Sequence, residues 1–281
     1  MLVIALNMLG RYTGLTVDRH SPEELLALLA PHFRATRPDG AGPFPTALLY
    51  SGCDGPSATV DAWAEALHAR GWATIRVDSH TPRGLEEPQG WALVCAGQVL
   101  TGAERAGDVA VTLAHAAALS FVDSRRIALV GASHGGWSIM EFLSMADNGQ
   151  VPLTLEEWPM GFTGPMTDRV HASFLLYPYC GELNRATWQG WEAQVPMLML
   201  LAEDDVVADP ENCLDIVEEG AARGLPISAE VLDDVTHAFD HRSTLEFSPS
   251  RYDPDAAAYA LRRMGEFLDA PQTETVKDTG G

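Results

Sequence analysis

Short apolar runs and longer amphipathic segments alternate along most of the chain. Each apolar run has the length and composition of a strand, and each amphipathic segment carries apolar residues at helical spacing. The expected strands are 46–50, 72–77, 127–130, 172–177, 197–201 and 227–232, and the expected helices are 57–70, 104–119, 137–145, 212–223 and 254–268. Regular alternation of this kind predicts an α/β protein, with a mostly parallel central sheet covered by helices on both faces.

Two segments interrupt the alternation. Residues 147–170 contain three prolines and the aromatic side chains of Trp158 and Phe162. Such a long irregular insert is either a lid or pocket wall, or a surface loop whose aromatic side chains pack down, and both interpretations stay open. Residues 271–281 are polar, so we expect a flexible tail. The remaining residues, 1–270, are expected to form a single domain.

The segment Gly131-Ala132-Ser133-His134-Gly135 lies between an apolar strand and a helical segment. A Gly-x-Ser-x-Gly sequence in this context is typical of a nucleophile elbow, a sharp turn that exposes the serine hydroxyl at the edge of the sheet. The flanking glycines allow strand and helix to approach closely because they lack a Cβ atom. We therefore predict that Ser133 is a nucleophile.

A serine hydroxyl needs a base within reach and an acid that orients the base. In this architecture the partners follow the serine in the order acid, histidine, each on a loop after a strand. His237 follows the last expected strand and is the candidate base, with His241 as the second choice. The acid falls within Glu203-Asp204-Asp205, and chain order alone does not choose between Asp204 and Asp205.

A tetrahedral intermediate at Ser133 requires two hydrogen-bond donors for its oxyanion. One is expected to be the backbone N–H of His134, directly after the nucleophile. The other is expected to be the backbone N–H of Cys53, in the loop 51–55 after the first strand, which we call the oxyanion loop.

These pieces together resemble the dienelactone hydrolase family of α/β-hydrolases. The matching segments are 51–55, 78–84, 131–136, 177–180, 202–205 and 237–240. In that family the triad aspartate lies three residues after a glycine that ends a strand. Ala202 occupies the place of that glycine, so the resemblance implies Asp205 as the acid.

The chain departs from the family pattern at the nucleophile, where the namesake enzymes carry cysteine in place of Ser133. It also has Ser51-Gly52 where many relatives have His-Gly. The resemblance therefore implies an esterase-like relative of the α/β-hydrolase fold, with serine as the nucleophile, rather than a true dienelactone hydrolase.

The function expected from these residues is hydrolysis of a carboxylic ester or lactone through an acyl-enzyme, with no metal and no organic cofactor. One alternative is a small peptidase of the prolyl-oligopeptidase type, although such enzymes usually carry a gating domain for which this chain has no room. Another is a non-catalytic binding module, which would predict a broken triad.

Trp137, Trp158 and Arg83 are candidate substrate-binding residues. Arg83 is also expected to have a structural role, in which it holds its loop in place by pairing with a buried aspartate such as Asp78.

The net charge of −21 argues against nucleic acid and anionic membranes as partners, which leaves a small-molecule substrate.

The apolar start, Met1–Leu9, is too short to span a bilayer and lacks the features of a signal peptide, so a packed strand or helix in a cytoplasmic protein is expected. In that compartment the four cysteines are expected to be reduced thiols, although Cys53–Cys95 and Cys180–Cys213 pairings are geometrically feasible. The oligomeric state stays open.

Overall fold

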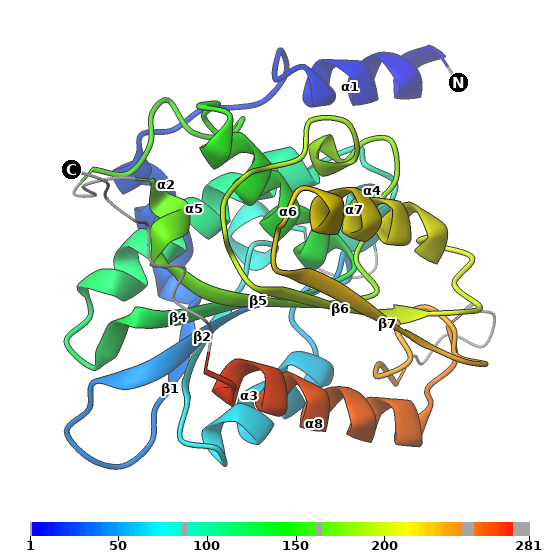
Figure 1. Ribbon diagram of the computed structural model, residues 1–281. Coiled ribbons are helices and arrows are strands. Elements are labelled where there is room, and N and C mark those ends of the chain that lie inside the picture. The colour runs from blue at the N-terminus through cyan, green and yellow to red at the C-terminus, as the bar shows by residue number, and fades with distance from the viewer. Residues whose placement is uncertain (1, 86–88, 161–164, 243–249, 272–281) are drawn as a thin grey trace, which may run out of the picture.

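The computed structural model describes residues 2–85, 89–160, 165–242 and 250–271. Its centre is a seven-stranded sheet in the order β1-β3-β2-β4-β5-β6-β7 (Figure 1). The strands are β1 (Arg34–Thr36), β2 (Phe44–Tyr50), β3 (Ala73–Val77), β4 (Val122–Ala132), β5 (Val170–Leu176), β6 (Met197–Ala202) and β7 (Ile227–Leu232). Only the edge strand β1 runs antiparallel to its neighbour, and every other pairing is parallel. The predicted mostly parallel sheet is confirmed.

Helices cover both faces of the sheet, as Figure 1 shows, with α3 and α8 on one face and α2, α5, α6 and α7 on the other. The helices are α1 (Leu2–Tyr12), α2 (Pro22–Leu29), α3 (Ala58–His68), α4 (Gln89–Cys95), α5 (Gly102–Ala118), α6 (His134–Asp147), α7 (Pro210–Ala222) and α8 (Pro254–Asp269). Because successive strand residues point to opposite faces, β4 contributes to two cores. Its Ala128 and Val130 pack in the layer of α3 and α8, whereas Ile127 and Leu129 pack in the layer of α5 and α6.

Three of these elements, β1, α2 and α4, were not expected from the hydrophobic pattern, whereas a packed strand or helix was expected where α1 lies. The start of α2 carries a signal, because Ser21 and Glu24 form a reciprocal capping box and Pro22 occupies the first turn. The apolar N-terminal segment is a helix, α1. It joins the body partly through polar contacts, with Asn7 donating to the carbonyl of Gln98 and Arg11 pairing with Glu104 at 2.8 Å.

Within the described residues, no helix has both the length and the apolar character needed to cross a membrane.

The described part of the irregular insert packs against α5 and α6. Leu155 is fully buried, and the indole of Trp158 meets the ring of Phe142 edge-on at 6.1 Å. Thr154 donates its hydroxyl to the carbonyl of Glu104, which ties the insert to α5. Residues 161–164 of the insert and residues 272–281 of the expected tail lie outside the described residues.

Candidate active site

Ser133 occupies a sharp turn between β4 and α6. Its backbone has φ +49° and ψ −113°, a conformation that L-residues rarely adopt, and it is held by a hydrogen bond from its N–H to the carbonyl of Leu176. A Cβ atom on Gly135 would lie 2.4 Å from the carbonyl oxygen of Tyr50, and one on Gly131 would lie 2.7 Å from the backbone of Gly135. The turn therefore requires glycine on both sides of the serine, as the elbow sequence predicts.

Three side chains from separate loops meet at this turn. His237 Nε2 lies 3.0 Å from Ser133 Oγ, and His237 Nδ1 lies 2.6 Å from Asp205 Oδ2. With the Nδ1 proton donated to the carboxylate, Nε2 is the acceptor that faces the serine hydroxyl. This arrangement can take a proton from Ser133 and hold the resulting imidazolium against Asp205.

The acid that contacts His237 is Asp205 and not Asp204. Asp205 Oδ1 accepts from the N–H groups of Val207 and Ala208, both at 2.8 Å, so its whole carboxylate is fixed. Asp205 is buried, whereas Asp204 is exposed and takes part in the loop through its own N–H, which donates to Val235. The register implied by the family resemblance agrees with this geometry.

The loop that carries His237 is held by a polar cluster that sequence reasoning missed. The ring of Tyr177 packs edge-on against His237 at 4.9 Å, and its hydroxyl donates to Asp240. Asp240 also accepts from Trp63 Nε1 at 2.9 Å. Burial raises the pKa of Asp240, and burial together with the Asp240 charge holds the pKa of Tyr177 well above its ordinary value. His241, the second choice for the base, contacts Asp54 at 3.4 Å instead of Ser133.

The oxyanion loop lies beside the serine. A Cβ atom on Gly52 would approach Ser133 Cβ to 3.7 Å, so the peptide that leads to Cys53 borders the nucleophile. His134, as the first residue of α6, has a backbone N–H that its own helix cannot use. Both expected oxyanion donors thus belong to segments adjacent to Ser133.

Buried polar side chains hold the oxyanion loop in place through hydrogen bonds. His80 Nε2 lies 3.1 Å from the carbonyl oxygen of Cys53, and burial with the nearby Arg105 charge lowers the pKa of His80 to about 3. Arg105 donates to the carbonyl of Ser51 at 2.8 Å and to its hydroxyl at 3.3 Å. A pattern in the sequence could have indicated this network: Glu104, Arg105 and Asp108 are charged residues among the small and apolar residues of α5.

Arg83 is engaged within the protein rather than facing a substrate. Its guanidinium forms a two-pronged pair with Asp108, at 2.8 and 2.9 Å, and donates to the carbonyl of Ser79. Arg83 therefore has the expected structural role of holding its loop in place, and its partner is Asp108. The suggested partner, Asp78, instead accepts from the N–H groups of His80 and Thr81.

The two candidate tryptophans also serve packing. Trp137 is 5% exposed, donates from Nε1 to Glu141, and lies between the rings of His134 and Tyr179 at 5.2 and 5.0 Å. Trp158 contacts Phe142, more than two helical turns along α6 from Ser133. Substrate binding by Trp137 and Trp158 stays a prediction. Trp137 is turned into the protein and supports Tyr179.

The expectation of four reduced thiols is wrong, because the structure pairs all four cysteines. Cys53 bonds to Cys95 and Cys180 bonds to Cys213, each with 5.2 Å between Cα atoms. The first disulfide links the oxyanion loop to α4, and the second links the loop after β5 to α7. Cys95 is exposed, whereas Cys180 and Cys213 are each only 1% exposed.

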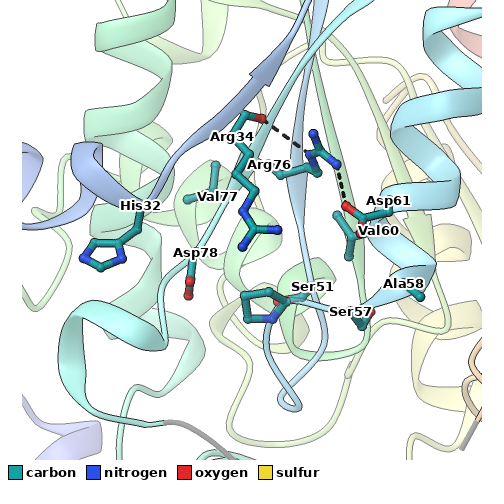
Figure 2. A pocket seen from close by; sticks show the side chains of 11 residues that line it. His32, Arg34, Ser51, Ser57, Ala58, Val60, Asp61, Arg76, Val77 and Asp78 are labelled. Carbon is teal, nitrogen blue, oxygen red and sulfur yellow. Dashed lines mark hydrogen bonds and ion pairs between the residues drawn. The ribbon is translucent and has the colours of Figure 1, made fainter.

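A cavity of about 270 Å³ lies at the carboxyl ends of β2 and β3, next to the oxyanion loop (Figure 2). Figure 2 shows the side chain of Arg34 extending into it, with Asp78 on one side and Arg76 and Asp61 on the other. Ser51 is the one member of the oxyanion loop that lines it, and Ser133, Asp205 and His237 do not. The triad geometry, and not this cavity, therefore defines the candidate active site.

The parallel sheet, the elbow and the order of the loops are those of an α/β-hydrolase. Residues 93–271, more than half of the chain, match the model of the dienelactone hydrolase family. The chain belongs to that family and is a hydrolase of the α/β-hydrolase superfamily. No curated protein matches the chain in sequence.

Solved structures agree with this fold. A Klebsiella pneumoniae protein assigned to the dienelactone hydrolases is 14% identical, with a TM-score of 0.60 over 84% of this chain and 98% of its own. Esterase 2 of Thermogutta terrifontis, phosphoramylated by tabun, is 17% identical, with a TM-score of 0.58 over 84% and 88%. A dienelactone hydrolase-like promiscuous phosphotriesterase from metagenomic libraries is 15% identical, with a TM-score of 0.58 over 84% and 97%.

Proposed function

We propose that the protein is a serine hydrolase that cleaves a carboxylic ester or lactone through an acyl-enzyme. One observation carries the proposal: a continuous chain of contacts runs from Ser133 Oγ through His237 to Asp205, on a strained elbow. Membership of a family of hydrolases supports the same reaction class. A small-molecule substrate is the only partner that the proposal requires.

In the first half of the reaction, Ser133 Oγ attacks the ester carbonyl while His237 Nε2 takes its proton. Asp205 stabilises the imidazolium, and the N–H groups of Cys53 and His134 stabilise the oxyanion. When the intermediate collapses, the bond to the leaving oxygen breaks and His237 protonates the departing alcohol. Water then attacks the acyl-enzyme with His237 as base, which releases the acid and restores the Ser133 hydroxyl. A lactone follows the same steps, with both products joined in one hydroxy acid.

Two alternatives are separated from this proposal by specific features. A binding module would have no need of a complete Ser133–His237–Asp205 chain on a strained turn. A small peptidase would use the same chemistry but would have to protonate an amine and hold a peptide beside the site. The relatives named above include an esterase and a phosphotriesterase, which makes activated esters the better first substrates to test.

The test is a substrate panel. Short p-nitrophenyl esters and an aromatic lactone are compared with peptidyl p-nitroanilides, with Ser133→Ala as the background. We expect kcat/KM for the esters or the lactone to exceed that for the anilides by at least about 100-fold, because the oxygen leaving group of an ester departs far more readily than the nitrogen leaving group of an anilide. Cleavage of the anilides alone would establish the peptidase. No turnover of any substrate above the Ser133→Ala background would contradict the proposal.

A further inference from the structure

One arginine lies buried at the point where the parts of the candidate oxyanion site meet. Arg105, in the first turns of α5, is fully buried. Its guanidinium donates to Ser51 on the loop after β2, to Ser79 Oγ on the loop after β3 at 3.0 Å, and to His134 Nδ1 at the start of α6 at 3.2 Å. One side chain therefore fastens together three segments that come from distant parts of the sequence.

In the part of the chain that the structure describes, four atoms accept from Arg105, and none of them is negatively charged. They are the carbonyl and hydroxyl oxygens of Ser51, the hydroxyl of Ser79 and a ring nitrogen of His134. Asp108, one turn further along the same helix, uses both of its oxygens for Arg83. Burying a cation without a carboxylate in contact is costly, so its retention calls for a reason beyond packing.

The guanidinium keeps its charge in this position. Burial lowers the pKa of Arg105 to about 10, which still leaves it protonated at neutral pH. Burial and the charge of Arg105 hold the pKa of His134 well below its ordinary value, so the imidazole stays neutral and accepts from the guanidinium. Within the described residues, Arg105 thus carries a positive charge that touches no carboxylate, and the nearby Asp108 offsets part of that charge without contact. The charge lies in a low-dielectric region beside the segments that carry the two expected oxyanion donors, where a charge acts over a longer range than in water.

We propose that Arg105 is a positioning residue of the oxyanion hole and that its charge stabilises the tetrahedral oxyanion. It orients the peptides that lead to the Cys53 N–H through the carbonyl of Ser51, and it braces the residue that supplies the His134 N–H through the imidazole. Preorganised dipoles and charges of this kind stabilise the transition state more than the ground state. The inference rests on the proposed function, because the oxyanion forms only if Ser133 attacks a carbonyl.

The test compares Arg105→Gln, which removes the charge but keeps polar groups, with Arg105→Lys, which keeps the charge but loses the forked geometry. The matched control is Arg185→Gln. Arg185 is also a buried arginine, but it pairs with Glu141 and contacts none of the three segments. Each variant is assayed for kcat and KM on p-nitrophenyl butyrate. Each is also assayed for inhibition by an alkyl trifluoromethyl ketone, which adds to the serine as an anionic hemiketal.

We expect Arg105→Gln to lower kcat and the ketone affinity together by about 100-fold while KM changes by less than about threefold. Arg105→Lys should recover part of that loss and lie about tenfold below the wild type. Arg185→Gln should lower thermal stability but leave the ratio of ketone affinity to KM unchanged. A purely structural role for Arg105 would not separate these quantities.

Wild-type ketone affinity in both Arg105 variants, or equal weakening of ketone affinity and ester KM, would overturn the inference. If Arg105→Gln does not fold, Arg105→Lys decides alone: a ketone affinity reduced relative to KM supports the inference, and an unchanged ratio overturns it. Ester turnover in the wild type, with loss in Ser133→Ala, shows whether the proposed function itself holds. Its failure would therefore be seen before any Arg105 variant is examined.

Discussion

The two halves of the candidate active site are built differently. The triad half consists of three side chains, Ser133, Asp205 and His237, each on a loop after a strand and each in direct contact with the next. The oxyanion half consists of backbone N–H groups on residues 51–55 and at the start of α6. Its geometry depends on buried side chains that contact the backbone of the oxyanion loop, Arg105 and His80 among them. The chemistry of the triad half is thus determined by which residues occupy three positions. The chemistry of the oxyanion half is determined by the side chains that hold its backbone in place.

The largest effect should come from the nucleophile of the triad half. Ser133→Ala leaves the elbow backbone in place but removes the hydroxyl that lies 3.0 Å from His237 Nε2. We expect kcat for p-nitrophenyl butyrate to fall on the order of a millionfold, as when a serine is removed from other triads. Thermal unfolding should show that the variant still folds. A folded variant with more than about one-hundredth of wild-type kcat would remove Ser133 from the mechanism.

The acid of the triad half gives the next effect and a matched control. Asp205→Asn should lower kcat by about ten-thousandfold, because an amide in place of the carboxylate favours the wrong imidazole tautomer. Asp204→Asn changes an exposed neighbour of the same type and should alter kcat by less than about threefold. The same kinetic assay measures both. A larger loss in Asp204→Asn than in Asp205→Asn would assign the acid to the other residue.

How far each half could be predicted from the sequence follows from the same difference. Ser133 and His237 could be found because a nucleophile elbow and a histidine after the last strand are local patterns in a fixed chain order. The choice of Asp205 over Asp204 needed a family resemblance, since only the fold shows which carboxylate meets the imidazole. The sheet was predictable from alternating apolar runs, but the short edge strand β1 and the helices α2 and α4 were not. At the N-terminus the pattern left strand and helix open, and the structure has the helix α1.

The oxyanion half was predictable only as far as its position. Its supports come from segments distant in sequence. The charged residues among the small and apolar ones of α5 could have indicated a buried polar network, but not that Arg105 contacts Ser51 or that His80 contacts Cys53. Arg83 was correctly given the structural role of holding its loop in place, but its partner is Asp108 rather than the nearby Asp78. Cysteine pairing was misjudged because the expected compartment outweighed the geometry. Because the Cys53–Cys95 disulfide is attached to the oxyanion loop, its reduction perturbs the oxyanion half without changing any triad side chain.

A mild dithiol should affect the oxyanion half selectively. Cys95 is exposed, so a dithiol can reduce the Cys53–Cys95 bond to two thiols, whereas the buried Cys180–Cys213 bond is protected until the protein unfolds. We expect kcat to fall about tenfold as the oxyanion loop loosens, because removing one oxyanion donor outright costs more than this. Thiol alkylation with peptide mapping identifies the reduced pair. Loss of kcat that accompanies reduction of Cys180–Cys213 instead would contradict the expected order.

A last effect concerns stability and leaves turnover out of account. The pKa of His80 is about 3 in the folded protein, against an ordinary value of 6.5, so the unfolded chain binds the proton more readily between these values. Stability is therefore lost as the pH falls from 6.5 toward 3, and this residue contributes up to about 4 kcal/mol to the loss. In His80→Gln, the free energy of unfolding measured by urea denaturation should fall less steeply over that range. Equal slopes in the two proteins would show that His80 is not buried in its neutral form.

The most direct test of the central claim, that Ser133 is activated by His237 and Asp205, is covalent labelling by a fluorophosphonate followed by peptide mass spectrometry. The account predicts one adduct per chain, on Ser133, formed in step with loss of ester hydrolysis and strongly slowed in Asp205→Asn. Labelling of another residue, or an active enzyme that the reagent leaves unmodified, would contradict it.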